Sequence, residues 1–147
     1  MSETIIAPGI YAIKNAQTSN YIVSRSTDTP ESVVRTAKKD ETGTLPAFNF
    51  EIKPINFGGY SVTSLLTGLH IGIAQPADGT PVEWAPSYAP QAIGFIHNDG
   101  RYVIRLPPSQ LPVERYAYEK IGAHEVAVTR SLNEAGTEWV LERVLLD

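Results

Sequence analysis

One short motif occurs three times along this chain of 147 residues. Residues 9–13, 58–62 and 100–104 each read glycine, any residue, tyrosine, any residue, then isoleucine or valine. The first two glycines lie 49 positions apart and the next two 42, and a similar length follows the last one. Repetition at a near-constant spacing predicts a repeated structural unit. The predicted units of a single domain, 1–147, span residues 9–57, 58–99 and 100–147.

Short alternating segments lie between the turn-forming residues. Eleven glycines and eleven prolines interrupt the chain, and between them apolar and polar residues alternate with the period of two that β-strands show. No apolar pattern of helical period continues for twelve residues. Four strands are predicted in each unit: 10–16, 21–24, 33–38 and 48–53; 60–65, 69–74, 82–85 and 93–97; and 102–106, 114–119, 125–130 and 139–145.

The last strand of each unit repeats a second feature. Residues 48–50, 93–95 and 139–141 each place two large apolar side chains two positions apart, on one face of a strand. Four strands repeated three times predict an all-β fold, a pseudo-threefold barrel closed by hairpins, which is the β-trefoil. Closure removes the sheet edges that invite aggregation. An ordinary β-sandwich with coincidental motifs is the alternative.

Composition restricts the partners of the chain. Twelve basic and 16 acidic residues provide no cluster of cations of the kind that nucleic acid requires. The absence of cysteine excludes disulfides and thiolate metal sites. We find neither an apolar run long enough for a membrane nor a secretory signal. We therefore expect a cytoplasmic monomer, with a mature secreted chain as the alternative.

The titratable residues do not form a pattern typical of an enzyme. The three histidines, His70, His97 and His124, fall in different units without metal-ligand spacing. We predict no catalytic group, metal or cofactor. Glu114 and Glu119 lie on one predicted strand, and we expect both to be solvated.

Sugar binding is one hypothesis for a fold of this kind. Ricin-type lectin repeats carry a Gln-x-Trp signature, but neither Trp84 nor Trp139 has glutamine two positions before it. We expect the Trp139 ring to pack in the barrel and the Trp84 ring to pack against the flank of a strand. The alternative for Trp84 is an exposed ring beside Pro86 and Tyr88 that stacks on a pyranose.

The polar segment of residues 24–32 suggests a different function. Asp28 and Ser32, with Thr27, can accept hydrogen bonds from nearby backbone groups, and Pro30 fixes one backbone angle. We expect a protruding, stiff loop that carries Arg25 near its start. Trypsin-type proteases bind such a cation in an acidic pocket, and a loop that is already ordered loses less entropy on binding.

The chain as a whole resembles the mushroom β-trefoil protease inhibitors. The resemblance rests on the length, the absence of cysteine and a signal peptide, and the Gly-x-Tyr-x-Ile opening. It is nearest to the cospin- and cnispin-type serine protease inhibitors and more distant from the mycocypin cysteine protease inhibitors. It implies a fungal defence protein that acts on trypsin-type serine proteases, located in the cytoplasm and released on tissue damage.

The resemblance also implies site residues. Arg25 takes the P1 position before the scissile bond, Ser24 is P2 and Ser26 is P1′, and Thr27 and Asp28 are further protease contacts. Arg130, at the edge of the segment 131–137, is a weaker alternative. Cysteine protease inhibition through the loops around 16–20 and 40–47 is another hypothesis.

Overall fold

The computed structural model describes residues 3–39, 45–56, 58–107 and 113–145. These residues form twelve strands and one short 3-10 helix, η1. In chain order the elements are β1 (Gly9–Asn15), β2 (Tyr21–Val23), β3 (Arg35–Ala37), η1 (Leu45–Phe48), β4 (Phe50–Pro54), β5 (Tyr60–Ser64), β6 (His70–Ile73), β7 (Val82–Ala85), β8 (Gly94–Asn98), β9 (Arg101–Arg105), β10 (Tyr116–Lys120), β11 (Glu125–Thr129) and β12 (Glu138–Arg143).

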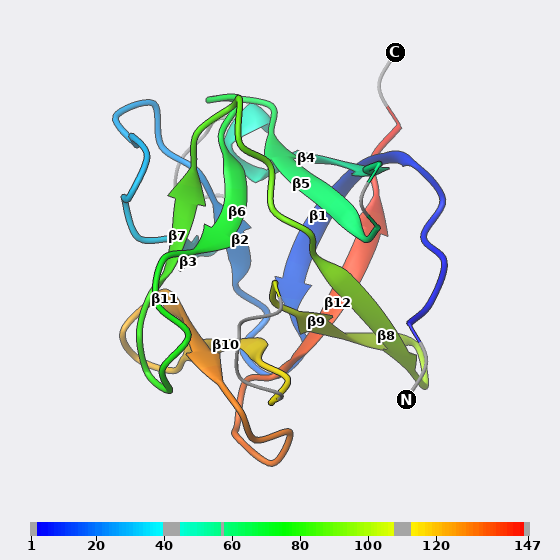
Figure 1. Cartoon of the computed structure of the whole chain (residues 1–147), viewed down its shortest axis with the longest axis vertical. Coiled ribbons are helices and arrows are strands. Elements are labelled where there is room, and N and C mark those ends of the chain that lie inside the picture. Colours follow the sequence, from blue (N-terminus) through cyan, green and yellow to red (C-terminus); the bar gives the residue numbers. More distant parts are fainter. Residues whose placement is uncertain (1–2, 40–44, 57, 108–112, 146–147) are drawn as a thin grey trace.

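Six strands close into a barrel (Figure 1). β1 pairs with both β4 and β12, β4 pairs with β5, and β9 pairs with both β8 and β12. Between β5 and β8, Tyr60 and Ile93 exchange two backbone hydrogen bonds of 2.9 and 2.8 Å, which complete the ring. Each barrel strand therefore has two neighbours and no free edge.

The other six strands form three hairpins, β2–β3, β6–β7 and β10–β11. Single bridges join each hairpin to the other two: Arg35–Glu125, Val33–Glu83 and Pro81–Ala127. Each unit thus gives its first and fourth strands to the barrel and its second and third to a hairpin. This arrangement confirms the predicted β-trefoil.

The repeated motif builds three equivalent sectors of one core. Ile13, Val62 and Ile104 are all buried in it, and the tyrosines two positions earlier, Tyr11, Tyr60 and Tyr102, pack in or against it. The fourth strands contribute three fully buried rings, those of Phe50, Phe95 and Trp139.

Replacing Ile13 by alanine is expected to lower the free energy of unfolding by about 2–4 kcal/mol. Ile13 is fully buried in the barrel core, so the truncation leaves a cavity that closed strands cannot readily collapse. Urea unfolding measures the change. Ile5→Ala is the control, because Ile5 is 91% exposed and its loss is expected to cost less than about 0.5 kcal/mol. Equal costs for the two variants would contradict this account of the core.

One aromatic pair differs from the prediction. Phe48 ends η1 instead of opening β4, and it packs in a separate cluster with Val23, Ala37 and Ala47. Phe50 lies in the barrel core. The expectation that Phe48 and Phe50 share one strand face is therefore wrong, because the 3-10 turn directs Phe48 elsewhere.

Within the described ranges, no helix has the length and apolar character needed to cross a membrane.

Candidate functional site

The loop between β2 and β3 projects from the body of the molecule (Figure 1). Arg25, Ser26 and Thr27 are exposed, and among the described contacts the Arg25 guanidinium has none. The loop is ordered by local hydrogen bonds, as predicted for Asp28 and Ser32: Asp28 Oδ2 accepts from the Arg25 N–H at 2.8 Å, and Ser32 Oγ accepts from the Thr29 N–H at 3.0 Å.

The backbone at Arg25 forms a tight turn. Its carbonyl accepts a hydrogen bond of 2.9 Å from the Asp28 N–H, while its own N–H is bound by the Asp28 carboxylate. A substrate-like P1 residue instead offers its carbonyl to the oxyanion hole of the protease. The turn must therefore open before Arg25 and Ser26 can lie in a protease cleft as a substrate does.

Ser24 differs from its expected role as a protease contact. It is only 1% exposed, and its hydroxyl lies 3.2 Å from the Ala47 carbonyl oxygen and 2.7 Å from the Ser64 hydroxyl. The chain enters the loop from the interior, so Ser24 anchors the base of the loop.

Arg130, the weaker alternative for the inhibitory residue, is bound by a neighbouring side chain. Its N–H and Nε donate hydrogen bonds to the Asp78 carboxylate at 2.8 and 3.1 Å.

A cavity of about 420 Å³ lies beside the later residues of this loop, Pro30 and Glu31. Its lining includes Glu31 from the loop, Glu83 from β7, and Tyr88 and Gln91 from the segment between β7 and β8. Tyr88 is 86% exposed. Neither carboxylate has a hydrogen-bond or ion-pair partner among the described residues. The exposed Tyr88 side chain thus lies at the same cavity as two carboxylates that can accept hydrogen bonds from a ligand.

Hydrogen bonds to backbone groups fix the walls of this cavity. The Glu31 N–H binds the Trp84 carbonyl at 2.9 Å, which joins the loop to β7. The Ser87 carbonyl lies 2.9 Å from His70 Nε2, so a buried imidazole holds the residue before Tyr88. Gln91 Oε1 accepts from the Ile73 N–H at 2.9 Å. This side chain occupies the space over Gly72 that a Cβ atom would need.

Trp84 forms part of the same cavity but offers no exposed ring. It is 1% exposed and stacks on Phe50 at a centroid distance of 6.0 Å. The prediction that Trp84 packs against a strand is confirmed, since Phe50 lies on β4, and the alternative of an exposed stacking ring at Trp84 is wrong. Among the described residues, its Nε1 is the one buried side-chain nitrogen or oxygen without a hydrogen-bond partner.

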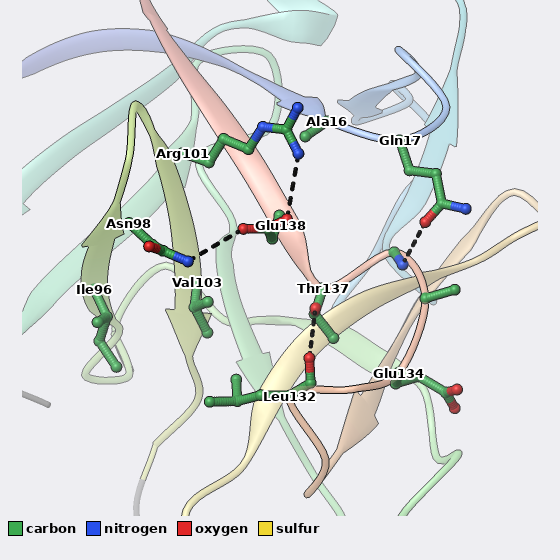
Figure 2. Close-up of a pocket in the computed structure, with 12 residues that line it drawn as sticks. Ala16, Gln17, Ile96, Asn98, Arg101, Val103, Leu132, Glu134, Thr137 and Glu138 are labelled. Atoms are coloured by element: carbon green, nitrogen blue, oxygen red, sulfur yellow. Dashed lines mark hydrogen bonds and ion pairs between the residues drawn. The ribbon is translucent and has the colours of Figure 1, made fainter.

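A second cavity, of about 510 Å³, lies among the β1–β2 turn, the β8–β9 hairpin and the β11–β12 connection. Figure 2 shows Glu138 between Arg101 and Asn98, with distances of 3.3 and 3.5 Å to their side-chain nitrogens. Glu134 also lines this cavity, and its carboxylate has no partner among the described residues. Burial raises the pKa of the neighbouring Tyr118 phenol, and the charges of Glu134 and Asp78 raise it further.

Sequence reasoning missed a buried carboxylate. Glu114 is exposed as expected, whereas Glu119 is 1% exposed, so the prediction that it is solvated is wrong. Its oxygens accept hydrogen bonds from the Thr18 hydroxyl, the Asn20 amide at 2.8 Å and the Thr36 hydroxyl at 2.7 Å. One side chain on β10 thereby fixes the β1–β2 turn and β3.

The three histidines differ in exposure. His70 is buried, whereas His97 and His124 are exposed. In the described part of the chain, no three His, Cys, Asp or Glu side chains come together as metal ligands. Of the loops considered for cysteine proteases, residues 40–44 lie outside the described residues.

Comparisons with known proteins find the same fold. The designed threefold-symmetric protein ThreeFoil superposes with a TM-score of 0.76 at 13% identity, over 92% of this chain and 99% of that one. The ricin B-like lectin of Macrolepiota procera, solved with lactose, gives 0.76 at 14% identity over 96% and 100%. The Rhizoctonia solani agglutinin gives 0.75 at 13% identity over 97% and 100%.

At these identities the likeness shows the β-trefoil fold alone. No protein-family model matches the chain, and no curated protein does. The predicted likeness to β-trefoil proteins is therefore established as a fold, while protease inhibition finds no support in the comparisons. Lectins are prominent among the structures with this fold.

Proposed function

We propose that this protein binds neutral saccharides in the cavity beside Tyr88. The single observation that carries the proposal is that Tyr88, which is 86% exposed, lines a cavity together with Glu31 and Glu83, whose carboxylates have no partner among the described residues. One face of a pyranose ring presents C–H groups, which pack on an aromatic face. The hydroxyl groups at its edge donate to carboxylate oxygens.

The charge of the cavity determines which class of sugar it can bind. The carboxylates of Glu31 and Glu83 accept hydrogen bonds and repel anions, and none of the described residues that line the cavity is basic. Sialylated or sulfated glycans would bring a further negative charge toward the carboxylates of Glu31 and Glu83, which is unfavourable. We therefore expect neutral hexoses and N-acetylhexosamines to bind and acidic glycans to be rejected.

Two further observations support this proposal over the other hypotheses. The cavity walls are held by hydrogen bonds to backbone groups, so little ordering accompanies binding. Two proteins of the same fold, from Macrolepiota procera and Polyporus squamosus, are lectins solved with lactose and with a sialylated trisaccharide. The fold is thus compatible with sugar binding, and the cavity provides a place for it.

Replacing Tyr88 by alanine is expected to weaken glycan binding about tenfold, because the sugar loses its apolar contact. Tyr88→Phe keeps the ring and should bind within about twofold of the wild type if the phenolic oxygen adds little. Neutral glycans retained on an array and then titrated by calorimetry give the affinities. Unchanged affinity of Tyr88→Ala for every retained glycan would place the sugar site elsewhere.

Trypsin inhibition through Arg25 is a second candidate. The observation that favours it is the exposed Arg25 guanidinium, which has no partner in the described part of the chain, at the start of an ordered, projecting loop. The turn at Arg25 and the burial of Ser24 count against a substrate-like pose. Inhibition through Arg25 would therefore require the turn to open while the guanidinium enters the acidic pocket of the protease.

A further inference from the structure

Gln91 presents a fixed hydrogen-bond donor at the cavity beside Tyr88. Its Oε1 accepts from the Ile73 N–H at 2.9 Å, and because only the oxygen of an amide can accept, this bond fixes which end is Nε2. Nε2 has no partner among the described residues. In that part of the chain the one buried side-chain nitrogen or oxygen without a partner is Trp84 Nε1, so Gln91 Nε2 is open to solvent. Since Gln91 lines the cavity, a ligand there can reach this donor.

An acceptor lies on the same face of the β6–β7 hairpin. The Gln91 amide occupies the space of the missing Gly72 side chain, with its atoms between 2.5 and 2.7 Å from where a Cβ would stand. Gly72 pairs directly with Glu83 across the hairpin, and the Cβ positions of paired residues lie on one face, about 5 Å apart. Glu83 therefore leaves its strand beside the Gln91 amide, and its carboxylate has no partner in the described part of the chain.

We propose that this donor and this acceptor recognise the acetamido group of an N-acetylhexosamine, an inference that rests on the proposed binding of neutral saccharides. The acetamido carbonyl would accept from Gln91 Nε2, and its N–H would donate to the Glu83 carboxylate. The two groups of a trans amide point in opposite directions, so a donor and an acceptor on separate side chains suit it. The apolar lining residues Ala74, Ala85 and Pro86 can cover the methyl group.

A hydroxyl group in place of the acetamido group uses less of this arrangement. It reaches less far than an amide and brings no methyl group to the apolar lining. The Gln91 amide is already held by the Ile73 N–H before a ligand arrives, so little entropy is lost when it binds the acetamido carbonyl. The additional hydrogen bond and apolar contact together predict about tenfold tighter binding of the acetamido sugar than of the parent hexose.

The test compares sugars that differ in the acetamido group alone: N-acetylglucosamine with glucose, and N-acetylgalactosamine with galactose. Each sugar is titrated into the ¹⁵N-labelled protein at neutral pH, and the amide shifts give the affinities. In at least one pair the acetamido sugar should bind about tenfold more tightly and shift the amide signals of Ile73 and Gln91.

Gln91→Glu tests the donor. The new carboxylate keeps the size of the side chain and an acceptor for the Ile73 N–H but has no donor, so the two sugars of a pair should bind within about twofold of each other. Gly72→Ala is an independent variant, because its Cβ would displace the Gln91 amide, and it should have the same effect. Gly94→Ala is the matched control: its Cβ would displace the Glu3 carboxylate, which does not line the cavity, and the preference should remain.

The outcomes separate this inference from the function on which it rests. Equal affinity of the wild type for both sugars of each pair would overturn the acetamido preference and leave sugar binding intact. No saturable binding of any of the four sugars would overturn the inference together with the proposed function. An undiminished preference in Gln91→Glu, in a variant whose amide spectrum is otherwise native, would show that Gln91 does not contact the acetamido group and would overturn the inference as well.

Discussion

Replacing Glu119 by alanine is expected to lower the free energy of unfolding by about 3–5 kcal/mol, the largest effect of any single change considered. The carboxylate accepts three hydrogen bonds, from Thr18, Asn20 and Thr36, and all four residues are at least partly buried. Truncation leaves these donors without an acceptor and opens a cavity. Chemical unfolding followed by tryptophan fluorescence measures the loss.

Two controls separate hydrogen bonding from charge. Glu119→Gln keeps the shape and one acceptor oxygen but points an NH2 group at a donor, so a smaller loss is expected. Glu125→Ala removes a surface carboxylate whose partner, Arg35, lies 3.5 Å away, which should cost less than about 1 kcal/mol. A Glu119→Ala variant as stable as Glu125→Ala would show that the buried network contributes nothing.

Replacing Arg25 by glutamate is expected to weaken trypsin inhibition by about 100-fold or more, if the protein inhibits trypsin. The acidic pocket of the protease would then face a like charge in place of the guanidinium. Inhibition constants for the wild type, Arg25→Glu and Arg25→Lys measure the effect, and lysine should be the milder change because it keeps the cation.

Arg130 provides the matched control for that measurement. It is also exposed at a loop edge, but Asp78 holds it, so Arg130→Glu should leave the inhibition constant within about twofold of the wild type. If Arg130→Glu abolished inhibition and Arg25→Glu did not, the β11–β12 connection would be the inhibitory loop. A wild-type protein that fails to inhibit trypsin at micromolar concentration would remove this candidate function.

The barrel was predictable because its signal is local and repeated. The three Gly-x-Tyr motifs place Ile13, Val62 and Ile104 at equivalent positions, and alternation along each strand separates buried from exposed side chains. The ends of all twelve predicted strands lie within two residues of the observed ones. Phe48 was misplaced because a single 3-10 turn before a strand leaves no periodic pattern.

The sites were less predictable, because they depend on contacts between distant segments. Glu119 shares one face of β10 with Ala117, whereas the larger apolar side chains of Tyr116 and Tyr118 alternate onto the other positions, so alternation did not signal its burial. Its partners, Thr18, Asn20 and Thr36, come from the first unit and could not be inferred. The exposure of Tyr88 follows from a turn in which the Ala89 N–H binds the Pro86 carbonyl, and the sequence of that segment does not specify which side chain remains uncovered.

Mapping a neutral sugar onto the protein tests the central proposal most directly. Lactose and a panel of neutral disaccharides are added to ¹⁵N-labelled wild-type protein, and the amide shifts are followed by NMR. Saturable shifts at Glu31 and at residues 83–91, lost in Tyr88→Ala, are the predicted result. No saturable shift from any neutral sugar, or shifts confined to other residues, would contradict the proposal that this β-trefoil binds saccharides beside Tyr88.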